Sequence, residues 1–410
     1  MKHLETVFNA LLGLLLVTLT SVSTTAQAQD STPVQPQDAT VEAVQADPMD
    51  SVEISLLTCQ PHDEVYSLYG HTAIRYRDWR KGKTVDAAFN YGVFDFNKPY
   101  FVARFVLGLT DYELGAYPFN LFLGEYRHFG SMVTEQVLNL SSEEKLQLRE
   151  ALSLNLQPEN RVYRYNYFYN NCTTKARDII EKCINGKVEY IGREGFAPTY
   201  REMVHQMTHN NPWAQFGNDL LLGLKADQPT NRQQQEFLPH NLMYDFDHAQ
   251  IYLNGQYRPL VKERRTPVPA GVQIVKTGFP LTPLVCAIIL VAVALIIFIV
   301  QWRRRRAFIL WDVLLMMATG SIGIMLTLML FSQHPTVSLN LQILLFNPLP
   351  WFFLWPVIRG RKARLYWMLT VILSVLFLIG GFFQHYAEGI QALALCLLMQ
   401  CCVHLTRTDK

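Results

Sequence analysis

The sequence has few charged residues for its length and no strong excess of either sign. Charged side chains make up 17% of the 410 residues and hydrophobic ones 50%, and the formal net charge is +2. A chain this apolar does not fit an ordinary soluble two-domain protein. Much of the arginine excess lies in two short segments near the C-terminus, so no basic domain is predicted and nucleic acid is not an expected partner.

The N-terminal hydrophobic segment lacks cysteine and is too short to span a membrane. Its apolar run is about 14 residues long, whereas a spanning helix needs roughly 20. Lys2 precedes this run and Ala26-Gln27-Ala28 follows it, as in a cleavable signal peptide. We therefore predict a signal peptide over residues 1–28, without the cysteine of a lipobox. Residues 29–50 are polar and free of aromatic residues, which predicts a disordered leader.

Long hydrophobic runs are absent from the middle of the chain and appear only after Pro280. Basic residues gather after the first and third of these runs, and the other two connecting loops have none. The positive-inside rule then places the C-terminus in the cytoplasm and the preceding domain outside. We predict a five-helix membrane domain over residues 281–406. The five apolar segments that are long enough to span lie at about 281–301, 307–331, 337–357, 365–384 and 389–405.

Polar residues interrupt the third of these segments. Asn340 lies at its beginning, and Asn347-Pro348 lies some depth into it. Polar groups inside a membrane span are costly and often functional, but asparagine also caps helices and proline breaks them. Both interpretations stay open at this point.

Residues 51–260 are predicted to form one exported α+β domain, followed by a linker over residues 261–280. About 200 residues are enough for a single domain with a sizeable core. Strands are predicted where β-branched and apolar residues alternate, with glycines at the breaks. The predicted strands cover residues 51–58, 71–77 and 85–93.

Two helices in this domain have clear N-terminal signals. Glu144 follows Ser141 at the spacing of a capping box. Asn171 comes after an aromatic, strand-like stretch over residues 163–169 and is predicted to cap a second helix. Cys172 is then the first residue of that helix.

Cys172 is the candidate nucleophile and His71 the candidate base. A thiol in the first turn of a helix lies against unpaired backbone N–H groups and the positive end of the helix dipole, which favour the thiolate. His71 follows Gly70 and opens a predicted strand. Papain-like enzymes pair a helix-start cysteine with a histidine on a sheet. Here the histidine comes first in the sequence, as in the circularly permuted NlpC-type peptidases and the lecithin:retinol acyltransferase group.

Other interpretations of these residues stay open. Cys172 is alternatively a small buried hydrophobic residue, and His71 an ordinary core histidine. The exported domain has three cysteines, Cys59, Cys172 and Cys183, and an odd number leaves one of them free or all three reduced. Cys59 is the alternative nucleophile.

The sequence predicts no metal site and no cofactor. His205 and His209 have the spacing of one helix face, but no neighbouring carboxylate completes a metal-binding motif. His62 and His128 are expected at the surface.

Several segments together resemble the Lnb family, and the resemblance extends over nearly all of the chain after the signal peptide. That family joins an N-terminal periplasmic domain to a five-helix membrane domain, so the resemblance implies the same organisation here. The segments that carry it are residues 54–59 (ISLLTC), 64–75 (EVYSLYGHTAIR), 89–96 (FNYGVFDF), 171–174 (NCTT), 334–335 (HP) and 347–348 (NP).

The resemblance implies a lipoprotein N-acyltransferase in the bacterial inner membrane. An acyl chain would move from a phospholipid to the α-amine of a diacylglyceryl-cysteine lipoprotein. His71 would take the proton from Cys172, whose thiolate would form a thioester that the lipoprotein amine then opens. Arg264, Arg265 and Lys276 are candidates for contact with phospholipid head groups.

Cysteine–histidine sites usually have a third group that orients the histidine. Asn90, Asp95 and Asn171 are the candidates for this supporting role, and the sequence does not rank them. Two further functions compete with acyl transfer. One is a membrane-tethered NlpC-type cell-wall peptidase, which would need an open polar groove. The other is a non-catalytic exported assembly protein.

Overall fold

The computed structural model of this protein describes residues 49–80, 83–95, 97–274 and 278–406. All of them belong to one compact unit. The predicted signal peptide over residues 1–28, most of the predicted leader over residues 29–50, and Lys276 lie outside the described residues.

A seven-stranded antiparallel sheet forms the centre of the N-terminal domain, with the strand order β10-β5-β1-β2-β3-β4-β6. The three predicted strands are confirmed as β1, β2 and β3. The strands are β1 (Val52–Cys59), β2 (His71–Arg80), β3 (Lys83–Val93), β4 (Asp111–Pro118), β5 (Val133–Leu138), β6 (Val162–Arg164) and β10 (Val261–Val268).

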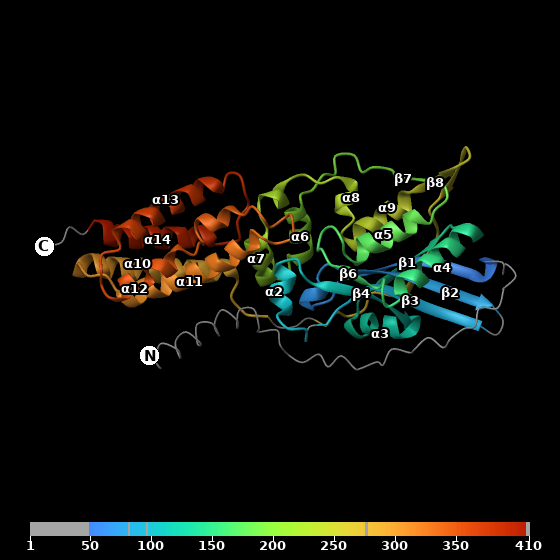
Figure 1. Cartoon of the computed structure of the whole chain (residues 1–410), viewed down its shortest axis with the longest axis horizontal. Coiled ribbons are helices and arrows are strands. Elements are labelled where there is room, and N and C mark those ends of the chain that lie inside the picture. The colour runs from blue at the N-terminus through green and yellow to red at the C-terminus, as the bar shows by residue number, and fades with distance from the viewer. Residues whose placement is uncertain (1–48, 81–82, 96, 275–277, 407–410) are drawn as a thin grey trace. The chain divides into compact units, whose positions relative to one another are not determined.

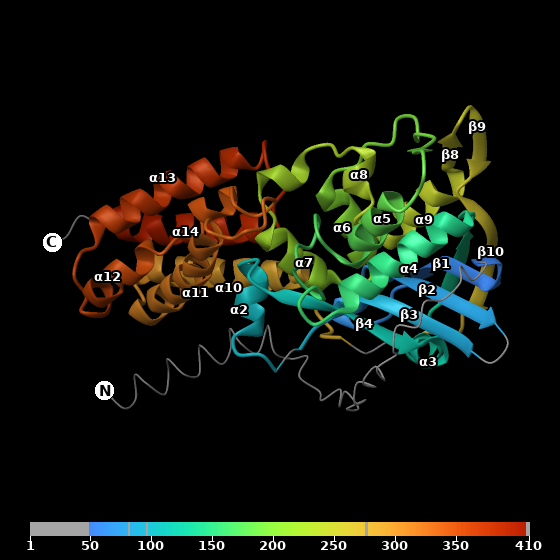
Figure 2. The same ribbon diagram turned by 45° about the vertical axis from the view of Figure 1, so that its right-hand side comes forward.

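Helices cover both faces of this sheet, which is why β1 is buried along most of its length. Figures 1 and 2 show α3 on the opposite side of the sheet from α4 and α5. Alternate residues of a strand point to opposite faces, so each helix layer packs on its own set of strand side chains. The helices are α3 (Phe119–Phe129) on one face, and α4 (Ser142–Leu156), α5 (Cys172–Lys182) and α9 (Pro239–His248) on the other.

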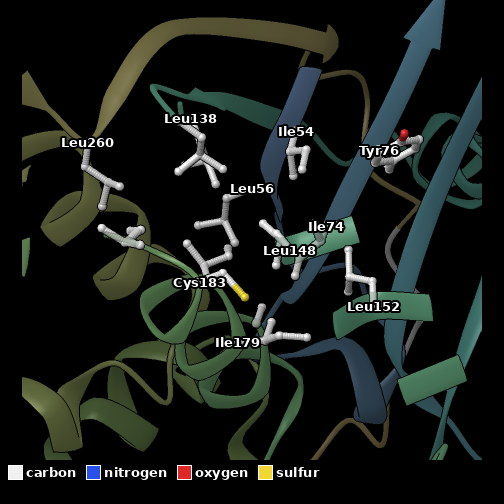
Figure 3. Packing of buried hydrophobic residues seen from close by; sticks show 14 of the residues in the cluster. Ile54, Leu56, Ile74, Tyr76, Leu138, Leu148, Leu152, Ile179, Cys183 and Leu260 are labelled. Carbon is white, nitrogen blue, oxygen red and sulfur yellow. The ribbon is translucent and has the colours of Figure 1, made fainter. Parts of the chain in front are cut away.

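Two separate apolar clusters result. Ile54 of β1 and Ile74 of β2 belong to the cluster that packs against Leu148 of α4 and Ile179 of α5 (Figure 3). On the opposite face, Leu57, Ala73 and Ala88 pack against α3 through Phe119, Phe122 and Leu123.

The two predicted helix starts are confirmed. The Ser141 hydroxyl accepts a hydrogen bond from the Glu144 N–H, and the Glu144 carboxylate accepts one from the Ser141 N–H at 2.7 Å. The second helix begins at Cys172, and the Asn171 side chain caps it. Most of the aromatic stretch over residues 163–169 is not a strand, because only Val162–Arg164 pairs with β4. Tyr167, Phe168 and Tyr169 instead pack into a separate apolar cluster.

The exported domain extends beyond both of its predicted limits. Met49, inside the predicted leader, is buried against the sheet core. Val261–Val268, inside the predicted linker, forms the edge strand β10 against β5. The sequence did not indicate this strand, because most of its side chains are polar and exposed, as is usual for a protected sheet edge.

A smaller three-stranded sheet and several short helices complete this domain. The sheet has the order β7-β8-β9. Its strands are β7 (Lys187–Glu189), β8 (Gln250–Leu253) and β9 (Gln256–Pro259), and the helices are α2 (Phe101–Val106), α6 (Tyr200–Thr208), α7 (Pro212–Leu221) and α8 (Arg232–Gln235).

The C-terminal region is helical and apolar, and it contains five helices within the described residues. Three segments are long and apolar enough to cross a membrane, Pro283–Arg304, Ile309–Met329 and Leu341–Ile358, and the other two helices are shorter. The helices are α10 (Pro283–Arg304), α11 (Ile309–Met329), α12 (Leu349–Ile358), α13 (Arg364–Gly380) and α14 (Ile390–Leu405).

The third apolar segment is interrupted rather than continuous. A 3-10 turn, η4 (Leu341–Leu344), precedes α12. Asn340 caps η4, since its Oδ1 accepts from the Gln342 N–H at 3.0 Å. Asn347 lies just before the N-cap of α12, and its Oδ1 accepts from the Leu349 N–H at 3.1 Å. Pro348 has no N–H to continue a helix from η4.

Buried polar side chains join the two regions. Asn340 Nδ2 donates to the Leu220 carbonyl at 2.8 Å, and Gln342 Nε2 donates to the Asp219 carbonyl at 2.8 Å. An apolar cluster that includes Phe237 and Phe346 surrounds this contact. The end of α7 is therefore packed directly onto the chain that precedes α12.

Candidate active site

Cys172 is the first residue of α5, and the local sequence determines its position. Asn171 Oδ1 accepts hydrogen bonds from the Thr173 and Thr174 N–H groups, both at 3.0 Å. The Thr173 hydroxyl lies 3.1 Å from the Thr72 hydroxyl of β2, so the helix start is fixed to the sheet. Cys172 as a whole residue is partly exposed.

His71, the first residue of β2, lies beside Cys172, and the two side chains shift each other's pKa. The Nε2–H of His71 donates to Asn90 Oδ1 on β3 at 2.7 Å. Because Asn90 occupies Nε2, Nδ1 is the nitrogen left for the thiol. The three side chains thus form a row from helix start to sheet, in the order thiol, imidazole and amide.

The electrostatics of this row favour an ion pair near neutral pH. Burial raises the pKa of Cys172, but the charge of His71, its hydrogen bond and a further bond from the Thr72 backbone together lower it to about 7. Burial lowers the pKa of His71, but the Cys172 thiolate and the hydrogen bonds to Cys172 and Asn90 more than offset this, so the pKa of His71 is raised. The thiolate–imidazolium form is the nucleophilic one.

Gly92 leaves the space that the imidazole occupies. A Cβ at this position would lie 2.8 Å from His71 Cε1 and 2.9 Å from Asn90 Oδ1. Any other residue would therefore displace one of the two side chains. Gly92 belongs to the FNYGVFDF segment, but the sequence did not assign it a role.

The other supporting candidates are not in this row. Asn171 is fully occupied as a cap, since its Nδ2 also donates to the Tyr167 and Phe237 carbonyls at 3.0 and 2.9 Å. Asp95 is exposed, and its carboxylate accepts from the Asn97 N–H at 2.8 Å. Of the three predicted candidates, only Asn90 touches His71.

Cys59 is close to the same histidine but in a different environment. It lies directly opposite His71 in the pairing of β1 with β2. It is 1% exposed, and burial raises its pKa well above the usual range despite a hydrogen bond with Tyr126. Cys183 belongs to the cluster on the other face of the sheet, and the cysteines among the described residues are all free.

Asn171 caps α5, and its side chain occupies two of the backbone N–H groups that could otherwise bind an oxyanion. Because the Thr173 and Thr174 N–H groups already donate to Asn171 Oδ1, the Cys172 N–H is the remaining donor in the first turn of α5. It lies at the positive end of the helix dipole.

Glu125 and His62 form a second polar group near His71 that the sequence did not indicate. His62 was expected at the surface, but it is 4% exposed and stacks on Phe129 at 4.1 Å between ring centroids. Its Nε2 lies 3.2 Å from Glu125 Oε1. This hydrogen bond lowers the pKa of Glu125, and the resulting negative charge contributes to the raised pKa of His71. No local motif marks Glu125, because α3 brings it to the site.

Tyrosines surround the thiol on its other side. Burial, followed by the charge of Cys172, raises the pKa of Tyr112 and of Tyr163 above the usual range. Tyr112 stacks on Tyr165 at 4.1 Å and on Phe94 at 4.8 Å between ring centroids. On this side the neighbours of the thiol are therefore mainly aromatic, and Lys175 lies over the Tyr163 ring at 5.0 Å.

The remaining histidines have other partners. His205 Nε2 lies 2.8 Å from Asp219 Oδ1, and His209 is exposed. Within the described ranges, no group of three or more histidine, cysteine, aspartate or glutamate side chains has the arrangement of a metal site.

Comparison with known proteins gave two family matches. Residues 39–206 match the family model of the Lnb N-terminal periplasmic domain, and residues 274–410 match that of the Lnb transmembrane domain. No curated protein and no solved structure matches the chain.

Proposed function

Because the chain belongs to the Lnb family of membrane proteins with a periplasmic domain, we propose that it is a lipoprotein N-acyltransferase of the bacterial inner membrane. In this proposal the acyl donor is a phospholipid, and the acceptor is the α-amine of a diacylglyceryl-cysteine lipoprotein. The C-terminus lies in the cytoplasm, as the arginines between α10 and α11 and between α12 and α13 favour.

We also propose that the N-terminal domain is a circularly permuted papain-like fold. Two features support this assignment. The cysteine opens a helix that packs on an antiparallel sheet, and the histidine opens a strand that precedes this helix in the chain. Asn90 then has the orienting role that papain-like sites give to a third residue.

In the first half-reaction the Cys172 thiolate attacks the carbonyl carbon of a phospholipid ester. His71 Nδ1 holds the proton that the thiol has lost. The Cys172 N–H and the dipole of α5 stabilise the oxyanion of the tetrahedral intermediate. When the intermediate collapses, the ester C–O bond breaks, His71 returns the proton to the leaving lysophospholipid oxygen, and the acyl group remains on Sγ as a thioester.

In the second half-reaction the neutral α-amine of the lipoprotein attacks the thioester carbon. His71 accepts a proton from the attacking nitrogen, the C–S bond breaks, and the Cys172 thiolate is restored as an amide forms. In this scheme the membrane helices hold the catalytic domain at the bilayer in which both substrates are anchored. The enzyme then only has to orient the two substrates relative to Cys172.

The observation that carries this proposal is the row of Cys172, His71 and Asn90, in which the pKa of the thiol is lowered to about 7. A decisive experiment is mass spectrometry of a lipoprotein N-terminus from cells that carry the wild type, Cys172→Ala, His71→Ala or Cys59→Ala. We expect the third acyl chain to be lost with the first two substitutions and retained with Cys59→Ala.

Full triacylation with Cys172→Ala would contradict the proposal and favour a non-catalytic assembly protein. Release of cell-wall peptides by purified wild-type protein, without any change in lipoprotein acylation, would instead identify it as a membrane-tethered peptidase that uses the same pair.

A further inference from the structure

Glu125 is a carboxylate near His71 that neither half-reaction uses. It belongs to α3 and follows Phe122 by three residues, a spacing that puts both on one side of the helix. The Phe122 ring lies 6.5 Å from the His71 ring between centroids. Ala73, two residues after His71 on β2, packs against α3, and alternate residues of a strand share a face. Glu125 and His71 therefore lie on the same face of the sheet.

The chain after β1 places His62 beside the same histidine. Cys59, the last residue of β1, is opposite His71 in the pairing with β2, and His62 follows three residues later. A Cβ at Gly70 would lie 3.7 Å from Pro61 Cδ, so this chain stays against the start of β2. Two separate segments, α3 and the chain after β1, therefore converge next to His71.

His62 orients the Glu125 carboxylate without neutralising it. Their hydrogen bond lowers the pKa of Glu125, so the carboxylate is ionised and accepts from the His62 Nε2–H, 3.2 Å away. His62 Nδ1 is buried and has no hydrogen-bond partner among the described residues. A doubly protonated ring would leave an N–H without an acceptor there, which is costly. The neutral tautomer is therefore favoured, and Glu125 keeps its negative charge.

Glu125 also differs from other carboxylates of this domain, which have arginine partners. Arg265 binds Glu53 at 2.6 Å and Arg264 binds Asp247 at 3.2 Å, which argues against the lipid head-group contact that the sequence had indicated for these arginines. Among the described residues, no lysine or arginine forms a salt bridge with Glu125, whose side chain is 46% exposed. The face of the sheet next to His71 thus has an accessible negative charge and needs a cation from outside.

The acceptor of the proposed reaction provides such a cation. An α-amino group has a pKa of about 7.7 to 8.0, so it arrives largely as an ammonium. A carboxylate beside the thioester attracts this ammonium. It also stabilises the positive charge that develops on the nitrogen as the nitrogen attacks the thioester carbon.

We propose that Glu125, oriented by His62, binds the α-amine of the acceptor beside the thioester on Cys172. Glu125 accepts a hydrogen bond from one N–H of the bound group. The ammonium loses one proton to water, the neutral amine forms the N–C bond, and the second proton passes to His71 as the C–S bond breaks. The inference rests on the proposed function. It adds that the acceptor is selected by its charge, in the second half-reaction alone.

The test starts from the acyl-enzyme, formed when the full-length protein in detergent micelles reacts with phosphatidylglycerol. The acyl-enzyme is then mixed with a synthetic diacylglyceryl-cysteine peptide, which has an α-ammonium, or with hydroxylamine, which is uncharged at neutral pH. Mass spectrometry follows the loss of the acyl group from Cys172. The ratio of the two rates measures recognition of the ammonium, because both nucleophiles attack the same thioester with the same base.

For Glu125→Gln we expect this ratio to fall by about tenfold, as the loss of a hydrogen bond to a charged group allows. Most of the loss should appear in the KM for the peptide. The influence of Glu125 on the pKa of His71 is a separate and smaller effect, because it acts equally on both nucleophiles. Glu125→Asp keeps the charge and should recover part of the ratio.

His62 is a positioning residue, and its substitution should have a smaller effect. His62→Phe keeps a ring to stack on Phe129 and removes the Nε2–H, so the ratio should fall by a few-fold. Glu194→Gln is the matched control. Glu194 is exposed, and the preceding Arg193 binds Asp245 of α9, on the opposite face of the sheet from α3. This variant should keep the wild-type ratio.

An unchanged ratio in Glu125→Gln would overturn the inference, and so would an equal fall of both rates, which would show that Glu125 acts only through His71. Failure of the proposed function is distinguishable. If the wild type forms no acyl-enzyme, that function fails, and native mass spectrometry of Cys172→Ala with the peptide and its N-acetylated form tests the amine site alone. A preference for the free amine that Glu125→Gln abolishes would support the site, and equal binding of both peptides would contradict it.

Discussion

Two cysteines lie near one histidine in this protein, at the end of β1 and at the start of α5. Cys59 is paired across β1 and β2 with His71, but it is buried against α3 and the pKa of its thiol is raised. Cys172 is partly exposed at a helix N-terminus, and His71 lowers the pKa of its thiol to about 7. Proximity to a base is therefore not sufficient for a reactive thiol. Access and stabilisation of the charged form separate the two positions.

The largest difference in activity is expected between alanine substitutions of Cys172 and of Cys59. We expect Cys172→Ala to abolish acyl transfer, because Cys172 is the proposed carrier of the acyl chain. Cys59→Ala removes a buried sulfur and should cost only about 1 kcal/mol of stability, with activity retained. Initial rates with purified protein, together with thermal unfolding of both variants, measure this contrast.

The next largest losses of activity are expected from substitutions of His71 and Asn90. His71→Ala is expected to reduce the rate of thioester formation by about 100-fold or more, the usual contribution of a general base. Asn90→Ala removes one hydrogen bond to a charged imidazole and should reduce it by about 10 to 100-fold. The supporting candidates outside the row offer a control, and Asp95→Ala should behave as the wild type. Equal losses for Asn90→Ala and Asp95→Ala would argue against the orienting role of Asn90.

Gly92→Ala should have an intermediate effect without touching any reactive atom. The added methyl group would overlap His71 Cε1 and Asn90 Oδ1, and a misplaced base lowers the rate by about tenfold or more. Gly192→Ala is the matched control, because nothing lies within 4 Å of a Cβ at that position. Circular dichroism shows whether either variant alters the fold. Equal rates for the two variants would mean that the imidazole tolerates the shift.

The pH dependence of alkylation should distinguish the two thiols. The pKa of Cys172 is lowered, so its thiolate is present above about pH 7 and is lost as the pH falls below that value. The Cys59 thiol stays protonated at and around pH 7, because burial raises its pKa. Iodoacetamide labelling followed by peptide mass spectrometry should therefore show a rise through about pH 7 at Cys172 only.

Glu125→Gln should produce the smallest change. Its carboxylate contributes to the raised pKa of His71, so its removal destabilises the imidazolium. The inflection for Cys172 labelling should then move to higher pH by a fraction of a unit. A shift to lower pH would show that Glu125 acts mainly on another group.

The sequence predicted the local features of the site and missed the ones that depend on packing. The cap of Asn171, the helix start at Cys172 and the strand start at His71 are short-range, and each has a residue signature. Asn90 could not be ranked above Asp95, because a bulge between β3 and β4 and the space at Gly92 decide which side chain meets the imidazole. Glu125 comes from α3, and only the tertiary fold places it near His71.

In the membrane region, too, the sequence predicted the local features and missed those that depend on packing. The five apolar segments were recognisable from their composition, whereas the interruption of the third one by η4 was not. Asn340 and Gln342 are buried because they bond to the carbonyls at the end of α7. Such a contact between distant segments has no local pattern. The polar edge strand β10 was missed for a related reason, since its exposed side chains lack the alternation of a buried strand.

The most direct test of the central claim is to find the acyl group itself. The wild-type protein is incubated with phospholipid in the absence of any lipoprotein, digested, and examined by mass spectrometry before and after treatment with neutral hydroxylamine, which cleaves thioesters. We predict one fatty acyl group on the peptide that contains Cys172, removed by hydroxylamine and absent from the peptide that contains Cys59. An acyl group on Cys59, or none on either peptide, would contradict the account.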